Sequence, residues 1–371
     1  MIRSIEYIEK KKKNQESIVS FIDSDKGIMH KDNIIFQNLI QQLNDEQIRR
    51  DQQEMLSFLY IISSISKHHH RNAFFFSKIE YLLREYKKEI CHFFTSEKLF
   101  RIFGSNKRIL LFLIEENFLK LDQSISDTMI KKYEKFNYKE FFFSELKKFL
   151  ANEETSRASE TDEKTFKAKR RVGENDGYIC KLIRNDMIDD FINYVNSTNF
   201  QLTSTIESSI FETNPMLNKR NPSLIEYSAF FGSIQIFKYL LLNKVELTES
   251  LFIYAIHGRN SEIIHLLEEN LNNISNRIYA RSVIESIKCH HNDLADYFMN
   301  KQNEDVVFYD GIKYYNYFYF PNELDSLIPF YYLCKHDYYK IVNFILQESD
   351  IEINFVVIFF YICLFKYCFL F

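Results

Sequence analysis

The chain has few of the residues that interrupt regular backbone structure: it contains seven glycines and four prolines in 371 residues. β-Sandwiches, barrels and doubly wound sheets need many turn positions with positive φ, and glycine usually occupies them. The seven glycines also form neither a Gly-x-Gly-x-x-Gly nor a Gly-x-x-x-x-Gly-Lys pattern, so both nucleotide-binding fingerprints are absent. The composition predicts an all-α chain that uses no nucleotide cofactor.

The chain has no large excess of either charge, because 47 basic and 51 acidic residues leave a net charge of −4. This balance produces no overall field that would attract nucleic acid, so we expect none as a partner. The six cysteines include no Cys-x-x-Cys pair, which is typical of buried thiols in a reducing compartment. The first residues lead into a lysine run without the apolar stretch of a signal peptide, so we expect a cytoplasmic protein.

Residues 1–150 are predicted to form a helical N-terminal domain. Apolar residues recur there at the spacing of one helix face, with charged residues between them. Further helices are expected over 108–116 and 138–150. The two clearest stripes are Met55, Phe58, Leu59 and Ile62, and Ile79, Leu82, Leu83, Tyr86 and Ile90.

Residues 151–174 differ in character from the chain on either side. They include six acidic and six basic residues, and only Phe166 and Val172 are large and apolar. Such a segment buries little apolar surface, so it is predicted to be a mobile charged linker. Its basic run 167–171 matches a nuclear import signal, but a solvated loop is the favoured interpretation.

The second half of the chain repeats a pattern. Each unit has a short first helix, a polar turn, and a second helix with two apolar pairs on one face. The equivalent turn positions are Gly232, Arg259, His290 and Asp337, which are 27, 31 and 47 residues apart. A single helix pair cannot bury such a face, whereas stacked neighbours can. Residues 175–354 are therefore predicted to be a repeat domain.

These units resemble ankyrin repeats, in degenerate form. Ser223-Leu-Ile-Glu226 stands where the family has Thr-Pro-Leu-His, and only Gly232 supplies the turn glycine in register. Residues 225–240 and 254–269 are more similar to core blocks of a lineage-expanded ankyrin family of parasitic protists that carries an uncharacterised domain. The resemblance covers most of residues 50–354. It implies an ankyrin solenoid with an unknown protein partner and no known chemistry.

No catalytic site, cofactor site or metal site is predicted. Three consecutive histidines, as in His68-His69-His70, point about 100° apart on a helix and cannot converge on one ion. The run 289–291 has the same defect, and His257 and His265 lack the further ligands of a tetrad. We therefore expect a protein that is not an enzyme.

The partner-binding face is expected on the first helices of the repeats, five and two residues before each turn position. Tyrosine recurs in the first of these two positions, which favours either amphipathic anchors with a polar rim or packing between neighbouring first helices. The residues are Tyr227 and Phe230, Tyr254 and His257, Glu285 and Lys288, and Tyr332 and Lys335.

Residues 355–371 are apolar except for Lys366. This segment is slightly shorter than the ~18–20 residues expected of a spanning helix, and a lysine is costly in a bilayer. A packed terminal segment, a membrane anchor and a truncated reading frame remain as alternatives. The sequence as a whole predicts a non-enzymatic protein-interaction scaffold, and the alternative is a membrane-attached adaptor that uses residues 355–371.

Overall fold

The computed structural model of the chain describes residues 2–24, 34–132, 136–150, 163–302, 309–321, 324 and 327–348. Every regular element in these residues is a helix, as predicted, and their only β-type contact is an isolated bridge between Thr205 and Ser223. The helices of the first 150 residues are α1 (Ile2–Asp23), α2 (Ile34–Asp45), α3 (Gln52–His68), α4 (Phe75–Glu85), α5 (Lys87–Phe93), α6 (Ser96–Phe103), α7 (Lys107–Glu115), α8 (Gln123–Lys132), α9 (Tyr138–Phe141), α10 (Phe143–Leu146) and the 3-10 helix η2 (Lys147–Phe149).

The remaining helices begin with α11 (Glu163–Val172). Four helix pairs follow: α12 (Tyr178–Arg184) with α13 (Ile188–Thr198), α15 (Leu224–Phe231) with α16 (Ile234–Leu242), α17 (Leu251–Gly258) with α18 (Ser261–Asn270), and α19 (Asn276–Cys289) with α20 (Asn292–Met299). The short α14 (Pro215–Lys219) lies between the first two pairs, and the described chain continues with α21 (Tyr309–Lys313), the 3-10 helix η4 (Tyr317–Tyr319), α22 (Leu327–Lys335) and α23 (Tyr339–Glu348).

Local sequence signals start several N-terminal helices. The side chain of Asp51 accepts hydrogen bonds from the first backbone N–H groups of α3, and Thr95 and Asn106 cap α6 and α7 in the same way. Both predicted apolar stripes are buried. Helix α7 confirms the helix expected over 108–116, whereas residues 138–150 are divided among α9, α10 and η2.

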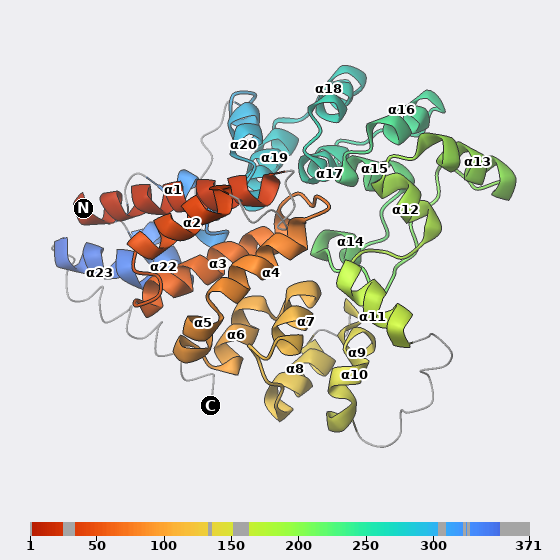
Figure 1. Cartoon of the computed structure of the whole chain (residues 1–371). Helices are drawn as coiled ribbons and strands as arrows, with labels where there is room; N and C mark the ends of the chain where they lie inside the picture. The colour runs from red at the N-terminus through yellow and green to blue at the C-terminus, as the bar shows by residue number, and fades with distance from the viewer. Residues whose placement is uncertain are drawn as a thin grey trace.

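The four helix pairs pack in chain order (Figure 1). The first helices α12, α15, α17 and α19 contact one another in sequence, and so do the second helices α13, α16 and α18. Every turn position that the repeat pattern made equivalent has left-handed backbone, which is reached within two residues of the end of the first helix. The φ angles are 69° at Gly232, 50° at Arg259, 58° at His290 and 63° at Asp337, and Asp186 after α12 has 48°.

Hydrogen bonds between neighbouring turns hold the pairs in register. The Asp186 carboxylate accepts from the backbone N–H groups of Gln235 and Ile236 at the start of α16, both at 3.0 Å. Asn260 Nδ2 donates to the carbonyl oxygen of Gly232 at 3.0 Å. Each turn therefore supplies a partner for backbone groups that a helix end leaves unpaired.

The buried apolar residues form two cores. One lies among α12–α20, and the other joins the N-terminal helices to side chains of residues 312–345. Figure 1 shows α23 beside α1, and the two helices are in contact. Gln15 Nε2 donates to Asn316 Oδ1 at 2.8 Å, and Lys340 Nζ donates to Asp51 Oδ2 at 2.6 Å. The fourth aligned unit, α22–α23, thus shares its core with the N-terminal helices and not with the other three units.

The described part of the predicted linker contains a helix that one arginine anchors. Residues 151–162 lie outside the described residues, but 163–172 form α11, and Arg170 is buried at 1% exposure. The Arg170 guanidinium donates to both carboxylate oxygens of Glu145, at 2.7 and 3.0 Å, and to the carbonyl oxygen of Phe141. The structure has a helix where a loop was expected, because Arg170 finds three acceptors on the N-terminal helices, while most other side chains of α11 are exposed.

Residues 349–371, which include the apolar segment 355–371, also lie outside the described residues. Within the described part of the chain, none of the helices combines the length and the apolar character required to cross a bilayer.

Candidate functional site

Six of the ten histidines meet where α3 ends against the turns after α17 and α19. We call this group the histidine junction: His68, His69, His70, His257, His290 and His291. His69 connects the two halves of the molecule, because its Nδ1 lies 2.7 Å from the carbonyl oxygen of Cys289 and its Nε2 lies 2.7 Å from Asp23 Oδ1. Both ring nitrogens of His69 therefore face an oxygen acceptor.

Burial favours the neutral form of five imidazoles in the junction. Burial lowers the pKa of His68, His70, His257 and His291 below the ordinary value, and lowers the pKa of His290 to about 3. Two of these rings are incompletely bonded within the described residues: neither ring nitrogen of His291 has a hydrogen-bond partner, and His290 Nδ1 has none. The junction therefore brings together several uncharged imidazole groups, some of whose ring nitrogens have no hydrogen-bond partner within the described residues.

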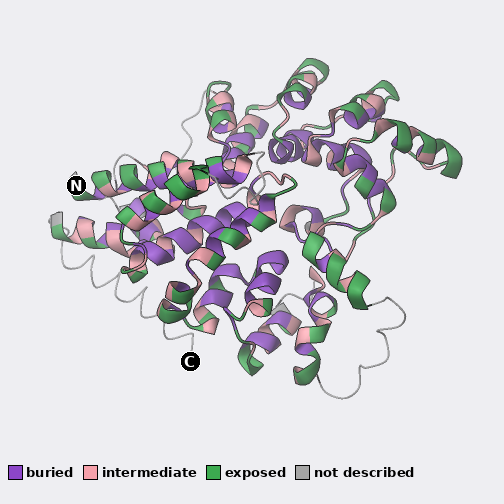
Figure 2. Ribbon diagram, viewed as in Figure 1, coloured by how far each residue is buried: buried purple, intermediate pink, exposed green. Residues whose placement is uncertain are grey.

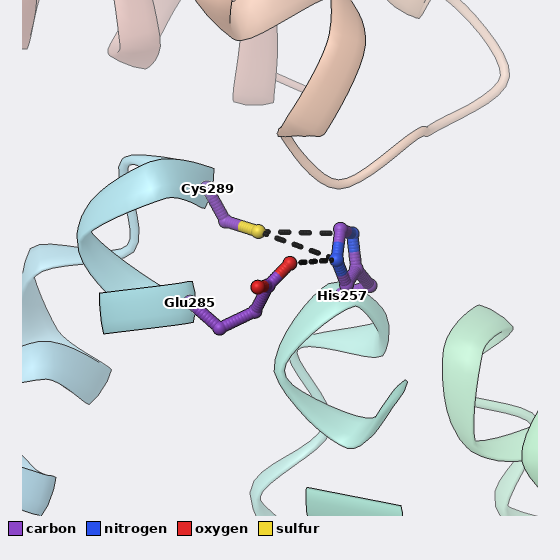
Figure 3. A group of neighbouring side chains, drawn as sticks. All are labelled: His257, Glu285 and Cys289. Carbon is purple, nitrogen blue, oxygen red and sulfur yellow. Dashed lines mark hydrogen bonds and ion pairs between the residues drawn. The ribbon is translucent and has the colours of Figure 1, made fainter. Parts of the chain in front are cut away.

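At one edge of the junction, His257 forms a cluster with Glu285 and Cys289 (Figure 3). The three ligand-type atoms lie within 4.8 Å of one another. His257 Nε2 is 2.7 Å from Glu285 Oε1, and Cys289 Sγ is 3.6 Å from His257 Nδ1 and 3.7 Å from Nε2. Glu285 and Cys289 are four residues apart on α19, so they project from one face of that helix toward α17.

The charges in the cluster follow from its surroundings. Burial alone would raise the pKa of Glu285, but the hydrogen bond from His257 and the ammonium of Lys288 lower it to about 2. Burial and the Glu285 carboxylate raise the pKa of Cys289 well above its ordinary value, so the thiol is protonated. A consistent chain of hydrogen bonds results, in which Cys289 donates to Nδ1 of His257, and Nε2 of His257 donates to Glu285.

A thiol next to an imidazole and a carboxylate is also the arrangement of a nucleophile with its base. Here the thiol is protonated, and Cys289 has 0% exposure while His257 has 2%. A substrate cannot reach this sulfur in the structure. The same donor set, with one sulfur, one nitrogen and one oxygen, matches the ligands that zinc prefers in proteins. His257, Glu285 and Cys289 are thus the described residues best placed to hold a metal ion.

Sequence reasoning missed this cluster because it judged each histidine run separately. Glu285 and Cys289 have the i, i+4 spacing of a helical ligand pair. The repeat register already put His257 and Glu285 on the same face of neighbouring first helices, so combining these two signals would have brought the three side chains together.

The proposed binding face is largely buried. Tyr227 and Tyr254 have no exposed surface, and Phe230 and His257 are at 4% and 2%. The Phe230 ring stacks on the His257 ring at 4.8 Å. These four residues follow the packing alternative, which corrects the expectation that they point out into an open concavity.

Other parts of the chain cover that face. Arg184 of α12 donates to the Tyr227 hydroxyl at 3.0 Å, and Arg220, in the connection that contains α14, donates to the Tyr254 hydroxyl at 2.9 Å. His70 Nδ1 approaches the carbonyl oxygen of His257 to 3.2 Å from the N-terminal side. Side chains of this same chain therefore contact the residues that were predicted to face a partner on the concave side.

The remaining predicted residues retain exposed surface. Lys288 is half-buried and donates to Glu285 at 2.7 Å. Lys335 is exposed on α22 near the rings of Tyr331 and Tyr332, and Tyr332 stacks on Tyr309 at 4.9 Å. Because α22 belongs to the N-terminal core, Tyr332 and Lys335 do not continue the row formed by Tyr227 and Tyr254.

Comparison with known proteins yields no relative: no family model matches the sequence, and neither the curated proteins nor the solved structures contain a significant match.

Proposed function

We propose that the chain is a non-enzymatic protein-binding scaffold, and that residues 178–299 form a degenerate ankyrin-type stack. The observation that carries this proposal is the serial contact of the four first helices combined with left-handed backbone at every equivalent turn. Stacks of this kind present long surfaces made of repeated positions, and such surfaces suit extended protein partners. The free thiols of Cys91, Cys180, Cys289 and Cys334 agree with a reducing location such as the cytoplasm.

We place the partner on the outer layer, which the second helices form. Figure 2 shows exposed residues concentrated on α13, α16 and α18, whereas α15 and α17 are mostly buried. Leu242, at the end of α16, is 81% exposed, which makes it the most exposed large apolar residue of the described chain. Tyr239, Leu266 and Tyr297 are half-buried and occupy one position, seven residues after each turn. A repeated apolar position beside an exposed leucine is a suitable anchor for a partner.

The test is affinity capture of the tagged full chain from its native cell, followed by mass spectrometry, with two variants. Leu242→Glu changes an exposed side chain at the end of α16, so we expect lost partners and an unchanged melting temperature. Ile34→Glu is the matched control, because this isoleucine is 66% exposed on α2, outside the stack. Equal capture by the parent and both variants would remove the outer layer from the proposal, and turnover of any substrate would contradict the non-enzymatic assignment.

A further inference from the structure

We infer that His257, Glu285 and Cys289 form a binding site for a divalent transition-metal ion of the zinc type, which joins α17 to α19. The inference does not depend on the scaffold proposal, because it concerns the interior of the stack and not its surface. It rests on donor chemistry, on the rigidity of the elements that carry the donors, and on access.

Two of the three distances between ligand atoms are close to those that such an ion requires, and all three atoms lie within 4.8 Å of one another. Zinc binds cysteine sulfur at about 2.3 Å and histidine nitrogen or carboxylate oxygen at about 2.0–2.2 Å, so tetrahedral ligand atoms lie roughly 3.2–3.6 Å apart. The Sγ of Cys289 is 3.7 Å from His257 Nε2. The Nε2–Oε1 separation of 2.7 Å is that of a hydrogen bond and must widen by about half an ångström when a metal replaces the proton. A small rotation of the Glu285 side chain provides this change.

The ligands are carried by rigid, well-packed helices. Helices α17 and α19 are in direct contact, and the His257 ring is held against Phe230. Lys288 donates to the Glu285 carboxylate and can keep that bond as an outer partner of the site. Three protein ligands leave one tetrahedral position for a water molecule.

The exposed surface of the cluster lies at Glu285 and the neighbouring Lys288. Cys289 and His257 are closed off, but the Glu285 side chain is 14% exposed and the neighbouring Lys288 side chain is 18% exposed. The carboxylate therefore forms the entrance, and the sulfur forms the inner end. This order favours capture by the ionised carboxylate first and coordination by sulfur second.

Binding also balances charge and protons. Before binding, the hydrogen bonds of the cluster place one proton between Cys289 Sγ and His257 Nδ1 and one between His257 Nε2 and the Glu285 carboxylate. When the metal binds Nε2, the ring proton moves to Nδ1, and the thiol loses its proton to solvent. One proton is released per ion, and the charges of the dication, the carboxylate and the thiolate sum to zero. The Lys288 ammonium adds one positive charge outside these ligands, at the partly exposed edge of the site.

The experiment uses the full chain after treatment with a chelator, titrated with Co²⁺ as a spectroscopic probe and with Zn²⁺ in competition against a chromogenic chelator. We expect one ion per chain, a sulfur-to-cobalt charge-transfer band in the near ultraviolet, release of one proton per ion, and a higher melting temperature with Zn²⁺. Cys289→Ser abolishes the band and weakens Zn²⁺ binding by more than the roughly 10–100-fold that loss of an outer partner costs.

Two further variants make the outcome decisive. Cys180→Ser is the matched control, because this buried thiol lies on α12, so the variant keeps the band and the affinity. Glu285→Gln changes the partly exposed ligand and serves as the second test if Cys289→Ser does not fold. Weaker Zn²⁺ binding by Glu285→Gln than by the parent supports the site. A parent chain that binds no ion, a band that survives Cys289→Ser, or unchanged Zn²⁺ affinity in Glu285→Gln overturns the inference and leaves a hydrogen-bonded cluster only.

Discussion

Gly232 and Gly258 meet backbone to backbone where α15 and α17 cross. A Cβ atom on Gly258 would lie 2.7 Å from the backbone nitrogen of Gly232 and 2.1 Å from the carbonyl oxygen of Ala229. Gly232 itself has a φ of 69° and closes α15 as a left-handed cap. This contact fixes the spacing of the two first helices, which also positions His257, the neighbour of Gly258, against α19.

Gly258→Ala is expected to destabilise the chain, because the added methyl group meets rigid backbone. Alanine gains about 0.5–1 kcal/mol of helix propensity over glycine, but overpacking costs roughly 1–3 kcal/mol or more. Urea unfolding of the parent and the variant measures the difference. Gly177→Ala is the control, since its Cβ would meet only side-chain atoms at 3.1 Å and beyond. A Gly258→Ala chain as stable as the parent would show that the helices separate easily.

The double variant Tyr227→Ala, Tyr254→Ala is expected to lower the melting temperature sharply. Both side chains are fully buried, and removal of a large buried aromatic group costs about 3–5 kcal/mol per site. Tyr178→Ala on α12, where the side chain is 56% exposed, should change the melting temperature little. A double variant that melts like the parent would return these tyrosines to the surface hypothesis.

Glu54→Ala is expected to destabilise the contact between the two ends of the chain by about 3–5 kcal/mol, because it leaves buried Lys11 short of one partner. Glu54 also pairs with Lys340 of α23 at 2.5 Å. Glu9→Ala removes an exposed pair with Lys12 on α1 and should cost at most about 1 kcal/mol. Equal effects of the two variants in denaturant unfolding would contradict the importance of the buried pair.

Arg170→Ala is expected to release α11 and to accelerate tryptic cleavage within residues 163–172. The arginine binds Glu145 and Phe141, so its loss removes three hydrogen bonds that anchor the helix. Arg171→Ala is the control, because the Arg171 side chain is 63% exposed. Timed digestion followed by mass spectrometry gives the cleavage sites. If the parent is cut in this stretch as fast as the Arg170→Ala variant, α11 is not anchored.

Lys107 provides a prediction of pH dependence. Burial lowers its pKa to about 8, although its Nζ donates to the carbonyl oxygens of Phe136 and Ile210. Between pH 8 and about 10 the unfolded chain holds the proton that the folded chain has lost, so this group stabilises the fold progressively as pH rises. Below pH 8 both states are protonated, and the contribution of Lys107 is constant.

The measurement is the free energy of unfolding of the parent minus that of Lys107→Met, from pH 7 to pH 10. This difference should be flat up to about pH 8 and should then increase by roughly 1.4 kcal/mol per pH unit. Subtracting the two free energies of unfolding removes the effect of cysteine and tyrosine titration, because the parent and the variant contain the same cysteines and tyrosines. Lys147→Met, an exposed lysine on η2, should give a flat difference throughout, and a flat curve for Lys107→Met would contradict the buried-lysine argument.

The sequence by itself determined the helical class and the turn register. Few glycines and prolines excluded sheet architectures, and apolar periodicity located α3, α4 and α7. These properties are local, because capping and helix periodicity act over three or four residues. The four turn positions have left-handed backbone for the same local reason, since a glycine or a polar residue near the end of each first helix marks the chain reversal.

The tertiary structure decided everything that depends on contacts between distant segments. Gln15 bonds to Asn316 across 301 positions, and His69 bonds to the Cys289 carbonyl across 220. These contacts assign α22 and α23 to the N-terminal core, fill the predicted concave face, and gather six histidines from three separate segments. A pattern within one window carries no information about such pairings, because they depend on which apolar faces are left to cover one another once the helices have formed.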